Sequence, residues 1–310
     1  MRYVIAISLI LFQISFSFAC FAEDESGGKA GAFLDIGIGA RAIAMGKAYS
    51  GTADDGTAMF WNPAGLVQPD KTEISAMHAF IFEDRAINYA AFTYPMSGHS
   101  LGAGWIRYGI SGIQERDNTG QLISEFSDSE NLFMLGYGRS LLSDAYKSIS
   151  LGTTVRFYYH SLFGYHASGW AADFGALFTL NEQDFAKNLN LSIVVQNIGG
   201  DIKWNTPGNL EENIPTSFRF GSSAELNSLP ITFALDLEKQ EDRSLRFHSG
   251  LEYVYDSILP LRIGFSHKYL SAGIGYIMET GKTDIIFDYA FTDDQISDKG
   301  LHFFSIGVRF

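Results

Sequence analysis

The feature that most constrains the fold of this chain is an alternation of side-chain character with a period of two, which begins near Lys71 and continues to Phe310. Residues 283–291 show it clearly: one phase carries Ile285, Phe287, Tyr289 and Phe291, and the other carries Asp284, Ile286, Asp288 and Ala290. Successive side chains of a β-strand point to opposite faces, so this period predicts strands whose two faces meet different surroundings. Residues 71–310 are therefore predicted to be all-β.

Fourteen segments of this kind follow one another, at about 71–82, 85–96, 100–113, 131–141, 149–162, 168–180, 189–199, 216–226, 231–240, 244–256, 261–268, 269–279, 283–293 and 301–310. Most reach the roughly 9–11 residues that a tilted strand needs to cross a bilayer. In lipid every backbone polar group needs a partner within the protein, so a spanning sheet must close on itself. The predicted fold is a transmembrane antiparallel β-barrel of about 14 strands.

The connections between the segments test this prediction, because hairpins at the two ends of an outer-membrane barrel differ in length. If the first strand runs outward, the external loops include 114–130, 163–167, 200–215 and 294–300. The periplasmic loops then include 142–148, 181–188, 227–230, 257–260 and 280–282. The two longest connections fall on the external side, as the barrel requires.

A soluble β-sandwich would also alternate, and it is the alternative fold. Aromatic residues make up 15% of the chain and give the apolar faces an unusual continuity, while the opposite faces carry glycines and charges. The last segment also ends on an aromatic residue, and its outer phase includes Phe304, Ile306, Val308 and Phe310. That ending resembles the signal by which outer-membrane barrels are recognised for insertion. The predicted partners are outer-membrane lipid and the barrel-assembly machinery, and the predicted location is the outer membrane of a diderm bacterium.

Residues 1–22 have the pattern of a secretory signal peptide. Arg2 provides a basic start, residues 4–18 are mostly apolar, and Cys20-Phe21-Ala22 fits the small-x-small pattern of a cleavage site. A membrane anchor is the alternative, but it needs a longer apolar run, of about 20 residues. A second alternative is lipidation at Cys20. Cleavage after Ala22 removes the only cysteine and so excludes disulfides, a thiol catalyst and a Cys-based zinc site.

Residues 23–70 form a segment of different composition, predicted to be an N-terminal hatch, or plug. Within it, residues 45–66 are rich in glycine and alanine and have little apolar bulk with which to build a core of their own. A short helix is expected at about 40–48, and Asn62-Pro63 is a turn signal that stops a long helix. Fourteen strands enclose a lumen too wide for wall side chains to fill. We therefore expect this segment to lie inside the barrel.

The inward phases of the predicted strands carry charges of both signs. They are Arg156, Asp173, Arg219, Glu225, Asp236, Glu238, Arg246, Glu252, Arg262, Asp284 and Asp288. These side chains are expected to pair with one another or with Arg41, Lys47, Asp54 and Asp55 of the hatch. The alternative is that they line a water-filled lumen without specific partners.

No motif in the sequence indicates catalysis, a cofactor or a metal. The seven histidines have no compact ligand spacing, no Gly-x-Ser-x-Gly elbow occurs, and Asp54-Asp55 in a glycine-rich loop is more typical of a cap than of an acid pair. Residues 37–42 superficially match a dinucleotide fingerprint, but no βαβ unit surrounds them. A hydrolase using a wall serine and histidine is left as an alternative. With a net charge of −13 and no cluster of Lys and Arg, nucleic-acid binding is not expected.

Several motifs resemble a known family. G-K-A-Y-S-G at 46–51, A-D-D at 53–55 and N-P-A at 62–64 resemble the hatch of the FadL/TodX outer-membrane transporters. W-N-P-A-G-L at 61–66, V-Q-N-I-G-G at 195–200 with I-P at 214–215, and F-D-Y-A-F at 287–291 are similar to its PorV/PorQ-like branch. The resemblance assigns as hatch-motif residues Asp54, Asp55, Trp61, Asn62, Pro63, Ala64 and Gly65.

This resemblance implies a 14-stranded barrel with a hatch. FadL-type members carry long-chain fatty acids or aromatic hydrocarbons, which leave sideways beside a kinked third strand. Here the third predicted strand contains Gly102, Gly104, Gly109 and Gly112, and its alternation becomes unclear after Tyr108, which suits a bulge. The alternative is that these glycines make room for the hatch.

Two functions follow from the resemblance. The first is a FadL-like channel for hydrophobic small molecules, in which residues 62–64 shape the mouth of the route and Asp54 and Asp55 fix the plug. The second is a PorV-like, non-enzymatic component of a protein secretion and surface-attachment system, in which loops 114–130 and 200–215 contact an exported protein. The chain is short for a FadL-type transporter, and short external loops speak against a large capturing groove.

Overall fold

The computed structural model describes residues 30–81, 85–181, 183, 185–241, 243–293 and 300–310. The predicted signal peptide and residues 23–29 lie outside the described residues. No helix in the described part of the chain is long and apolar enough to span a membrane.

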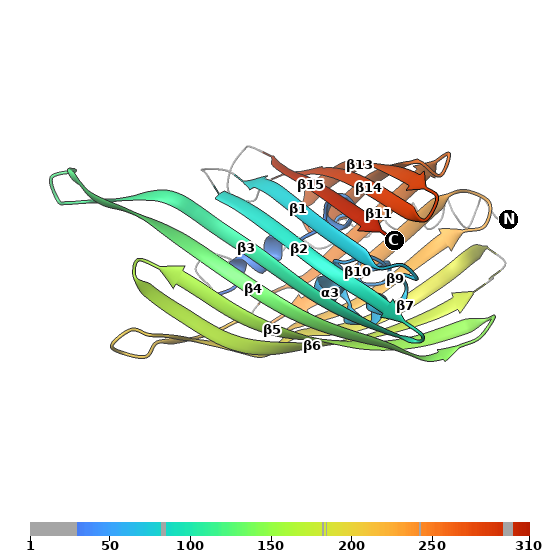
Figure 1. The fold of residues 1–310 in the computed structure, drawn as a ribbon, viewed down its shortest axis with the longest axis horizontal. Coiled ribbons are helices and arrows are strands. Elements are labelled where there is room, and N and C mark those ends of the chain that lie inside the picture. Colours follow the sequence, from blue (N-terminus) through green and yellow to red (C-terminus); the bar gives the residue numbers. More distant parts are fainter. Residues whose placement is uncertain (1–29, 82–84, 182, 184, 242, 294–299) are drawn as a thin grey trace.

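Fourteen strands within the described residues form one closed antiparallel ring (Figure 1). They are β1 (Glu73–Ile81), β2 (Arg85–Met96), β3 (His99–Arg116), β4 (Leu122–Ser143), β5 (Lys147–Leu162), β6 (Tyr165–Asn181), β7 (Ala186–Trp204), β9 (Ser217–Leu226), β10 (Ile231–Gln240), β11 (Leu245–Tyr255), β12 (Leu259–Ser266), β13 (Tyr269–Thr280), β14 (Thr283–Thr292) and β15 (Leu301–Arg309). β15 pairs with β1 and so closes the ring. A further short strand, β8 (Glu211–Asn213), pairs with the end of β7.

The two alternating sets of residues in the sequence correspond to the outer and inner faces of the barrel wall. On β14 the side chains of Phe287 and Phe291 are exposed on the outside, whereas Ala290 is buried inside. The same outward phase of large apolar side chains recurs around the ring and gives the exterior the apolar band that faces lipid in a membrane barrel. The predicted closed β-barrel is confirmed.

We call the end of the barrel that carries the β3–β4 hairpin the outer end and the end that carries Phe310 the inner end. Figure 1 shows the hairpin reaching well past its neighbours at the left. Long hairpins of outer-membrane barrels face the outside of the cell, which is the reason for these names.

Each predicted strand corresponds to one observed strand, but two predicted loops are wrong. Residues 114–130 are mostly strand, because β3 continues to Arg116 and β4 begins at Leu122. Residues 200–215 contain the end of β7 and all of β8. The two strands of a hairpin satisfy each other's backbone above the membrane, where no apolar outward face is required, so the ladder continues after the alternation fades. Loop 163–167 is also shorter than predicted, and most of loop 294–300 lies outside the described residues.

Residues 30–70, which we call the lumen segment, run inside the ring. They contain η1 (Ala32–Ile36), α2 (Ala40–Ala44), α3 (Ala58–Trp61) and η2 (Pro63–Val67). α2 lies against β12 to β15, and η2 lies against β2 to β6 on the other side. The helix predicted at 40–48 ends at Ala44, because Gly46 takes a left-handed conformation with φ of 62°. α3 ends at Trp61, and Asn62 caps η2 by accepting a hydrogen bond from the Ala64 amide.

The lumen segment approaches the wall so closely that several wall positions admit only glycine. A Cβ at Gly152 of β5 would lie 2.2 Å from the Pro63 carbonyl oxygen, and one at Gly264 of β12 would lie 2.0 Å from the Gly46 nitrogen. Both obstacles are backbone atoms and cannot rotate away. Glycines in the inward phase of the wall therefore match the glycines and alanines of the lumen segment, which explains why both parts of the sequence are rich in small residues.

Candidate functional site

The filled lumen has two chemically different halves. Between the lumen segment and strands β2 to β5 the inward side chains are mostly apolar and buried, with Arg156 of β5 as a buried charged exception, and the side chains of the lumen segment that pack on them are apolar too. The wall contributes Ile87, Tyr89, Ile106, Leu132, Met134 and Tyr158, and the lumen segment contributes Phe33, Ile38, Met59 and Phe60. Between the lumen segment and strands β9 to β15 the inward side chains include many buried, ion-paired charges among small residues. We call these the apolar half and the ionic half.

The apolar half is closed in this structure. The ring of Phe33 in η1 stacks on Tyr108 of β3, with ring centroids 5.9 Å apart and an interplanar angle of 14°. The gap between Phe33 and Phe60, bordered by Ile87 and Ile106 of the wall, has a volume of about 0 Å³. A continuous apolar surface thus runs from the outer end to the tip of α3, and side chains of the described residues fill the gap along it.

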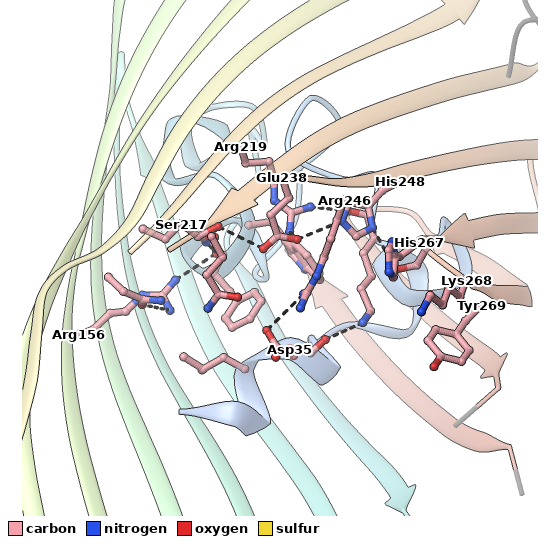
Figure 2. A pocket seen from close by; sticks show the side chains of 18 residues that line it. Asp35, Arg156, Ser217, Arg219, Glu238, Arg246, His248, His267, Lys268 and Tyr269 are labelled. Atoms are coloured by element: carbon pink, nitrogen blue, oxygen red, sulfur yellow. Dashed lines mark hydrogen bonds and ion pairs between the residues drawn. The ribbon is translucent and has the colours of Figure 1, made fainter. Parts of the chain in front are cut away.

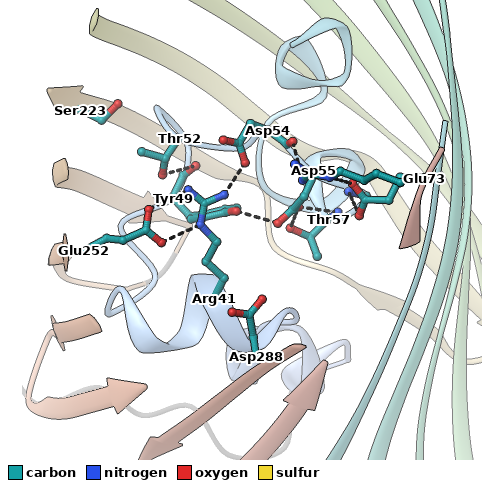
Figure 3. A network of polar contacts seen from close by, with 12 residues as sticks. Arg41, Tyr49, Thr52, Asp54, Asp55, Thr57, Glu73, Ser223, Glu252 and Asp288 are labelled. Atoms are coloured by element: carbon teal, nitrogen blue, oxygen red, sulfur yellow. Dashed lines mark hydrogen bonds and ion pairs between the residues drawn. The ribbon is translucent and has the colours of Figure 1, made fainter. Parts of the chain in front are cut away.

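The ionic half holds the lumen segment by three groups of contacts, and the first is centred on Arg41 (Figure 3). The Arg41 guanidinium lies between Asp54, with Nη1 2.5 Å from Oδ1, and Glu252 of β11, with Nη2 2.9 Å from Oε1. Glu252 also accepts from Arg262 at 2.6 Å, and Arg262 reaches Asp288 at 2.6 Å. This chain of alternating charges joins α2 to β11, β12 and β14.

The second group is centred on Asp236 of β10. Its Oδ2 accepts hydrogen bonds from the backbone amides of Tyr49 and Ser50, at 3.2 and 3.0 Å, and from Arg219 at 3.2 Å. Arg219 also contacts Glu238 at 3.0 Å, and Glu238 accepts from His248 at 3.0 Å. A buried wall carboxylate therefore fixes the backbone of the lumen segment directly.

The third group holds η1 at the outer end (Figure 2). The Asp35 carboxylate pairs with Arg243 and lies 3.6 Å from Arg246, and Lys47 Nζ donates to the Asp35 carbonyl oxygen at 2.6 Å. Burial in the lumen lowers the pKa of Lys47 to about 8, and the nearby Arg246 guanidinium acts in the same direction. Among the described residues, η1 has fewer such contacts than the remainder of the lumen segment.

Two arginines, from β5 and β9, contact the aromatic side chains at the end of α3. The Arg156 guanidinium lies 5.2 Å from the centre of the Phe60 ring, and that of Arg219 lies 5.2 Å from the Trp61 ring. Arg156 is fully buried and pairs with Asp173 at 2.5 Å. It also donates to the Phe60 carbonyl oxygen at 3.2 Å. The ion pair and the aromatic ring thus stabilise each other inside a low-dielectric wall.

Cavities lie on both sides of the lumen segment. The outer cavity, of about 180 Å³, is lined by more basic than acidic groups, namely Lys47, Arg156, Arg219, Arg246 and Lys268 against Asp35 and Glu238. The inner cavity, of about 260 Å³, has an apolar wall formed by Val254, Pro260, Ile277 and Ile286. A further inner cavity of about 220 Å³ is lined mainly by serine, threonine and asparagine. The lumen segment separates the outer space from the inner ones.

The seven hatch-motif residues all lie in the lumen segment, and four of them have polar roles there. Asp54 pairs with Arg41, and Asp55 accepts from the Thr57 amide at 2.8 Å and the Tyr49 hydroxyl at 2.7 Å. Trp61 Nε1 donates to the Ile38 carbonyl oxygen, and Asn62 Nδ2 donates to that of Ser50. Asp54 and Asp55 are thus pairing and capping groups.

The other three motif residues pack closely. Pro63 and Ala64 lie against Gly152 and Gly175 of the wall, and a Cβ at Gly65 would lie 1.9 Å from the Ala53 carbonyl oxygen. The motif therefore fixes the internal fold of the lumen segment and its contact with β5 and β6. Three residues of the predicted assembly signal, Phe304, Ile306 and Val308, lie in the outward phase of β15, and Phe310 follows the strand; Phe304, Ile306 and Phe310 are exposed.

Most of the inward charges predicted to form pairs do so, as described above, but the sequence analysis missed other members of the network. Glu73 of β1 and Arg309 of β15 form a pair at 2.8 Å, and Asp35 and Arg243 form another. Glu73 and Arg309 occupy the inward phases of the first and last strands, which must meet when a barrel closes. Their pairing could therefore have been predicted from the sequence. Asp35 and Arg243 lie outside the alternating pattern, so no feature of the sequence predicted their pairing.

The bulge expected in the third strand is present, but it lies at the outer end. The register of β3 against β4 shifts between Ile110 and Ile113, and Gly112 has φ of 70°. The pairing of β3 with β2 runs without a shift as far as Ile110, which is the last paired residue. Gly102 and Gly104 instead make room for Met59. Both explanations of the glycines therefore hold, each for different positions, and the wall beside β3 is continuous.

A second irregularity lies in β7, within the motif at 195–200. The register against β6 shifts on both sides of Ala172, and Asn197 takes φ of 60°. The Asn197 side chain turns inward, where its Oδ1 accepts from Tyr158 at 2.8 Å and from Arg156 at 3.2 Å. The bulge thus aims an amide at the buried Arg156–Asp173 pair.

No group of three or more His, Cys, Asp or Glu side chains within the described residues is arranged to hold a metal ion. A scan against protein-family models and a search of curated proteins gave no match. The solved structures gave many.

The fold is similar to that of solved hydrocarbon channels. The toluene transporter TbuX of Ralstonia pickettii matches with a TM-score of 0.57 at 14% identity, over 88% of this chain and 98% of that one. The monoaromatic hydrocarbon channel CymD matches with a TM-score of 0.61 at 12% identity, over 88% and 97%. A FadL homologue of Pseudomonas aeruginosa matches with a TM-score of 0.52 at 11% identity, over 86% and 97%.

The chain has the FadL-like barrel fold. Together with the apolar outward band, this fold makes the protein an integral outer-membrane β-barrel.

Proposed function

We propose that this protein passes hydrophobic small molecules through the outer membrane. The observation that carries the proposal is the apolar half of the lumen, which offers a continuous apolar surface from Tyr108 and Phe33 at the outer end to Met59 and Phe60 at the centre. The fold supports the proposal, since it is shared with channels for toluene and other monoaromatic hydrocarbons. Transfer of such a molecule from water to this surface lowers the free energy.

In this proposal the lumen segment is the hatch and η1 is its movable part. The backbone of α2 and of residues 45–66 is held by wall glycines and by Asp236, whereas η1 is tied mainly through Asp35 and Lys47. Displacing η1 removes the Phe33 ring from Tyr108 and opens the apolar half from the outside. The inner cavity, with its apolar wall, then receives the molecule on the far side of the hatch.

The test is uptake of toluene by proteoliposomes that contain the purified full chain. Phe33→Ala removes the stacked ring and should raise the initial uptake rate several-fold. Phe218→Ala, which removes an exposed phenylalanine from the lipid-facing side of β9, is the matched control and should leave the rate unchanged. Equal rates for Phe33→Ala and the wild type, in barrels that are equally heat-modifiable on gels, would exclude η1 as the gate.

A second candidate is the PorV-like role, favoured by the outer part of the β3–β4 hairpin. Residues 111–127 extend beyond the last residue at which β3 pairs with β2, and Leu122 and Ile123 are 51% and 60% exposed there. Exposed apolar side chains on a protruding hairpin suit contact with another protein. Shortening this hairpin should impair the display of an exported protein at the cell surface and leave toluene uptake unchanged. The opposite pattern would favour the channel alone.

A further inference from the structure

A row of polar side chains crosses the outward face of the first four strands. In the sheet register His78 of β1 lies opposite Asn88 of β2, Asn88 opposite Arg107 of β3, and Arg107 opposite Asn131 of β4. Figure 1 shows these four strands side by side at the front of the barrel. The side chains of neighbouring, directly paired residues on one face lie within reach of each other. The row is therefore one surface feature built by four strands.

On β3 and β4 the row marks the upper limit of the lipid-facing band. On β4 the outward side chains below it are Tyr137, Leu135 and Phe133, and those above it are Ser129 and Ser127. On β3 the outward side chains below it are Leu101, Ala103 and Trp105. The apolar run thus ends at the same register on adjacent strands.

The height of Arg107 along the barrel axis agrees with this limit. Between His99 at the lower end of β3 and Arg107 the barrel rises by roughly 20 Å, given about 3.3 Å per residue and a tilt near 40°. The apolar band of an outer-membrane barrel is about 25 Å tall. Arg107 therefore lies where the acyl chains of the outer leaflet meet their headgroups.

Arg107 is exposed, and no hydrogen bond or ion pair among the described residues involves its guanidinium. An unpaired guanidinium that faces lipid is costly at the middle of a bilayer and tolerated at the interface, where anionic headgroups supply the missing charge. Its two parallel N–H groups fit two oxygens of one phosphate.

The neighbouring amides leave donors for the same ligand. Asn88 Oδ1 is engaged by His78 Nδ1 at 2.8 Å, and Asn131 Oδ1 accepts from Trp105 Nε1 at 3.2 Å. Asn88 Oδ1 is thus bonded within the row and Asn131 Oδ1 by Trp105 just below it, and no hydrogen bond among the described residues uses the Nδ2 groups of Asn88 and Asn131, which flank Arg107. We propose that this row binds the phosphate of an anionic lipid of the outer leaflet, with Arg107 as its charged centre.

The test uses native mass spectrometry of the full chain in dodecyl maltoside, titrated with phosphatidic acid and, in parallel, with diacylglycerol, which lacks only the phosphate. The wild type should retain phosphatidic acid and not diacylglycerol. Arg107→Gln should weaken retention about tenfold, and Arg107→Lys, which keeps the charge and loses the fork, should weaken it less.

Arg116→Gln is the matched control, because Arg116 lies on the same strand in the protruding hairpin and bonds to Gly120 and Gln114. It should bind phosphatidic acid as the wild type does. Equal retention of diacylglycerol, or undiminished retention by heat-modifiable Arg107→Gln protein, would overturn the proposal. Displacement of the lipid by an equal concentration of inorganic phosphate would also overturn it, since the ligand would then be the free anion.

Discussion

Glu73 and Arg309 face each other across the junction of the first and last strands, with Arg309 Nε 2.8 Å from Glu73 Oε2. The other carboxylate oxygen of Glu73 accepts from the Gly56 amide at 3.1 Å. Arg309 in turn donates to the Asp54 carbonyl oxygen at 3.2 Å. One ion pair therefore joins the closure of the barrel to the placement of the lumen segment.

Breaking this pair should destabilise the barrel. Glu73→Gln leaves Arg309 without its partner in a largely buried site, and the free energy of unfolding should fall by about 3 kcal/mol. The measurement is the temperature or urea concentration at which heat-modifiable gel migration is lost. Glu211→Gln, which breaks an exposed pair with Lys203, is the control and should cost less than about 1 kcal/mol. A loss for Glu73→Gln no larger than the control would show that the junction pair contributes little.

The close approach of wall and lumen segment predicts a leak when it is disturbed. Gly152→Ala places a methyl group against the Pro63 backbone, so either the strand or the lumen segment must shift, at a cost of about 1–3 kcal/mol. Ion conductance in planar bilayers should rise, because the segment that fills the lumen is displaced. Gly208→Ala is the control, since nothing lies within 4 Å of its added carbon. Conductance that stays at the wild-type level in folded Gly152→Ala protein would mean that the segment tolerates the shift.

Much of the fold was predictable because lipid imposes a rule on every strand. Residues such as Phe287 and Asp288 must face opposite sides of the wall, so each strand can be recognised from its alternating apolar and polar residues. This requirement for an apolar outward face ends where the strands leave the membrane. Beyond Ile110 and Asp128 the β3–β4 hairpin has only its own backbone pairing, so Ile113 and Phe126 remain paired without an alternating pattern, and the sequence analysis took most of this part for a loop.

The candidate site was predictable only in part. The inward phase identified Arg156, Asp173 and Glu252 as pairing groups, but it could not say which partner each would find, because that depends on how the lumen segment folds inside the ring. The motif at 195–200 was noticed by resemblance, and only the structure shows that its bulge turns Asn197 toward Arg156. The gate proposed at Phe33 has no periodic neighbours and no motif, so nothing in the sequence marked it.

Lys47 predicts a dependence of stability on pH. Burial lowers its pKa from 10.5 to about 8 in the folded protein, so between these values the unfolded chain binds more protons than the folded one. Stability should therefore rise with pH across this window and gain nothing further from Lys47 outside it. The measurement is the midpoint of thermal unfolding at pH 7.5, 9 and 10.5, for the wild type and for Lys47→Met. A rise of equal size in both proteins would assign the effect to other groups.

Asp35 should control how often the outer end opens. Its carboxylate pairs with Arg243 and faces Arg246, and these contacts tie η1 to the start of β11. Asp35→Asn removes the charge but keeps the shape and the carbonyl oxygen that accepts from Lys47, so η1 should be displaced more often while the barrel stays folded. Toluene uptake by proteoliposomes should rise about two- to tenfold, with unchanged heat-modifiable migration. Asp201→Asn, on the exposed outer part of β7, is the matched control and should have no effect on uptake. If the uptake rate of Asp35→Asn equals that of Asp201→Asn, the contacts of Asp35 do not limit opening. The uptake rate of Phe33→Ala would then be the remaining test of whether η1 is the gate.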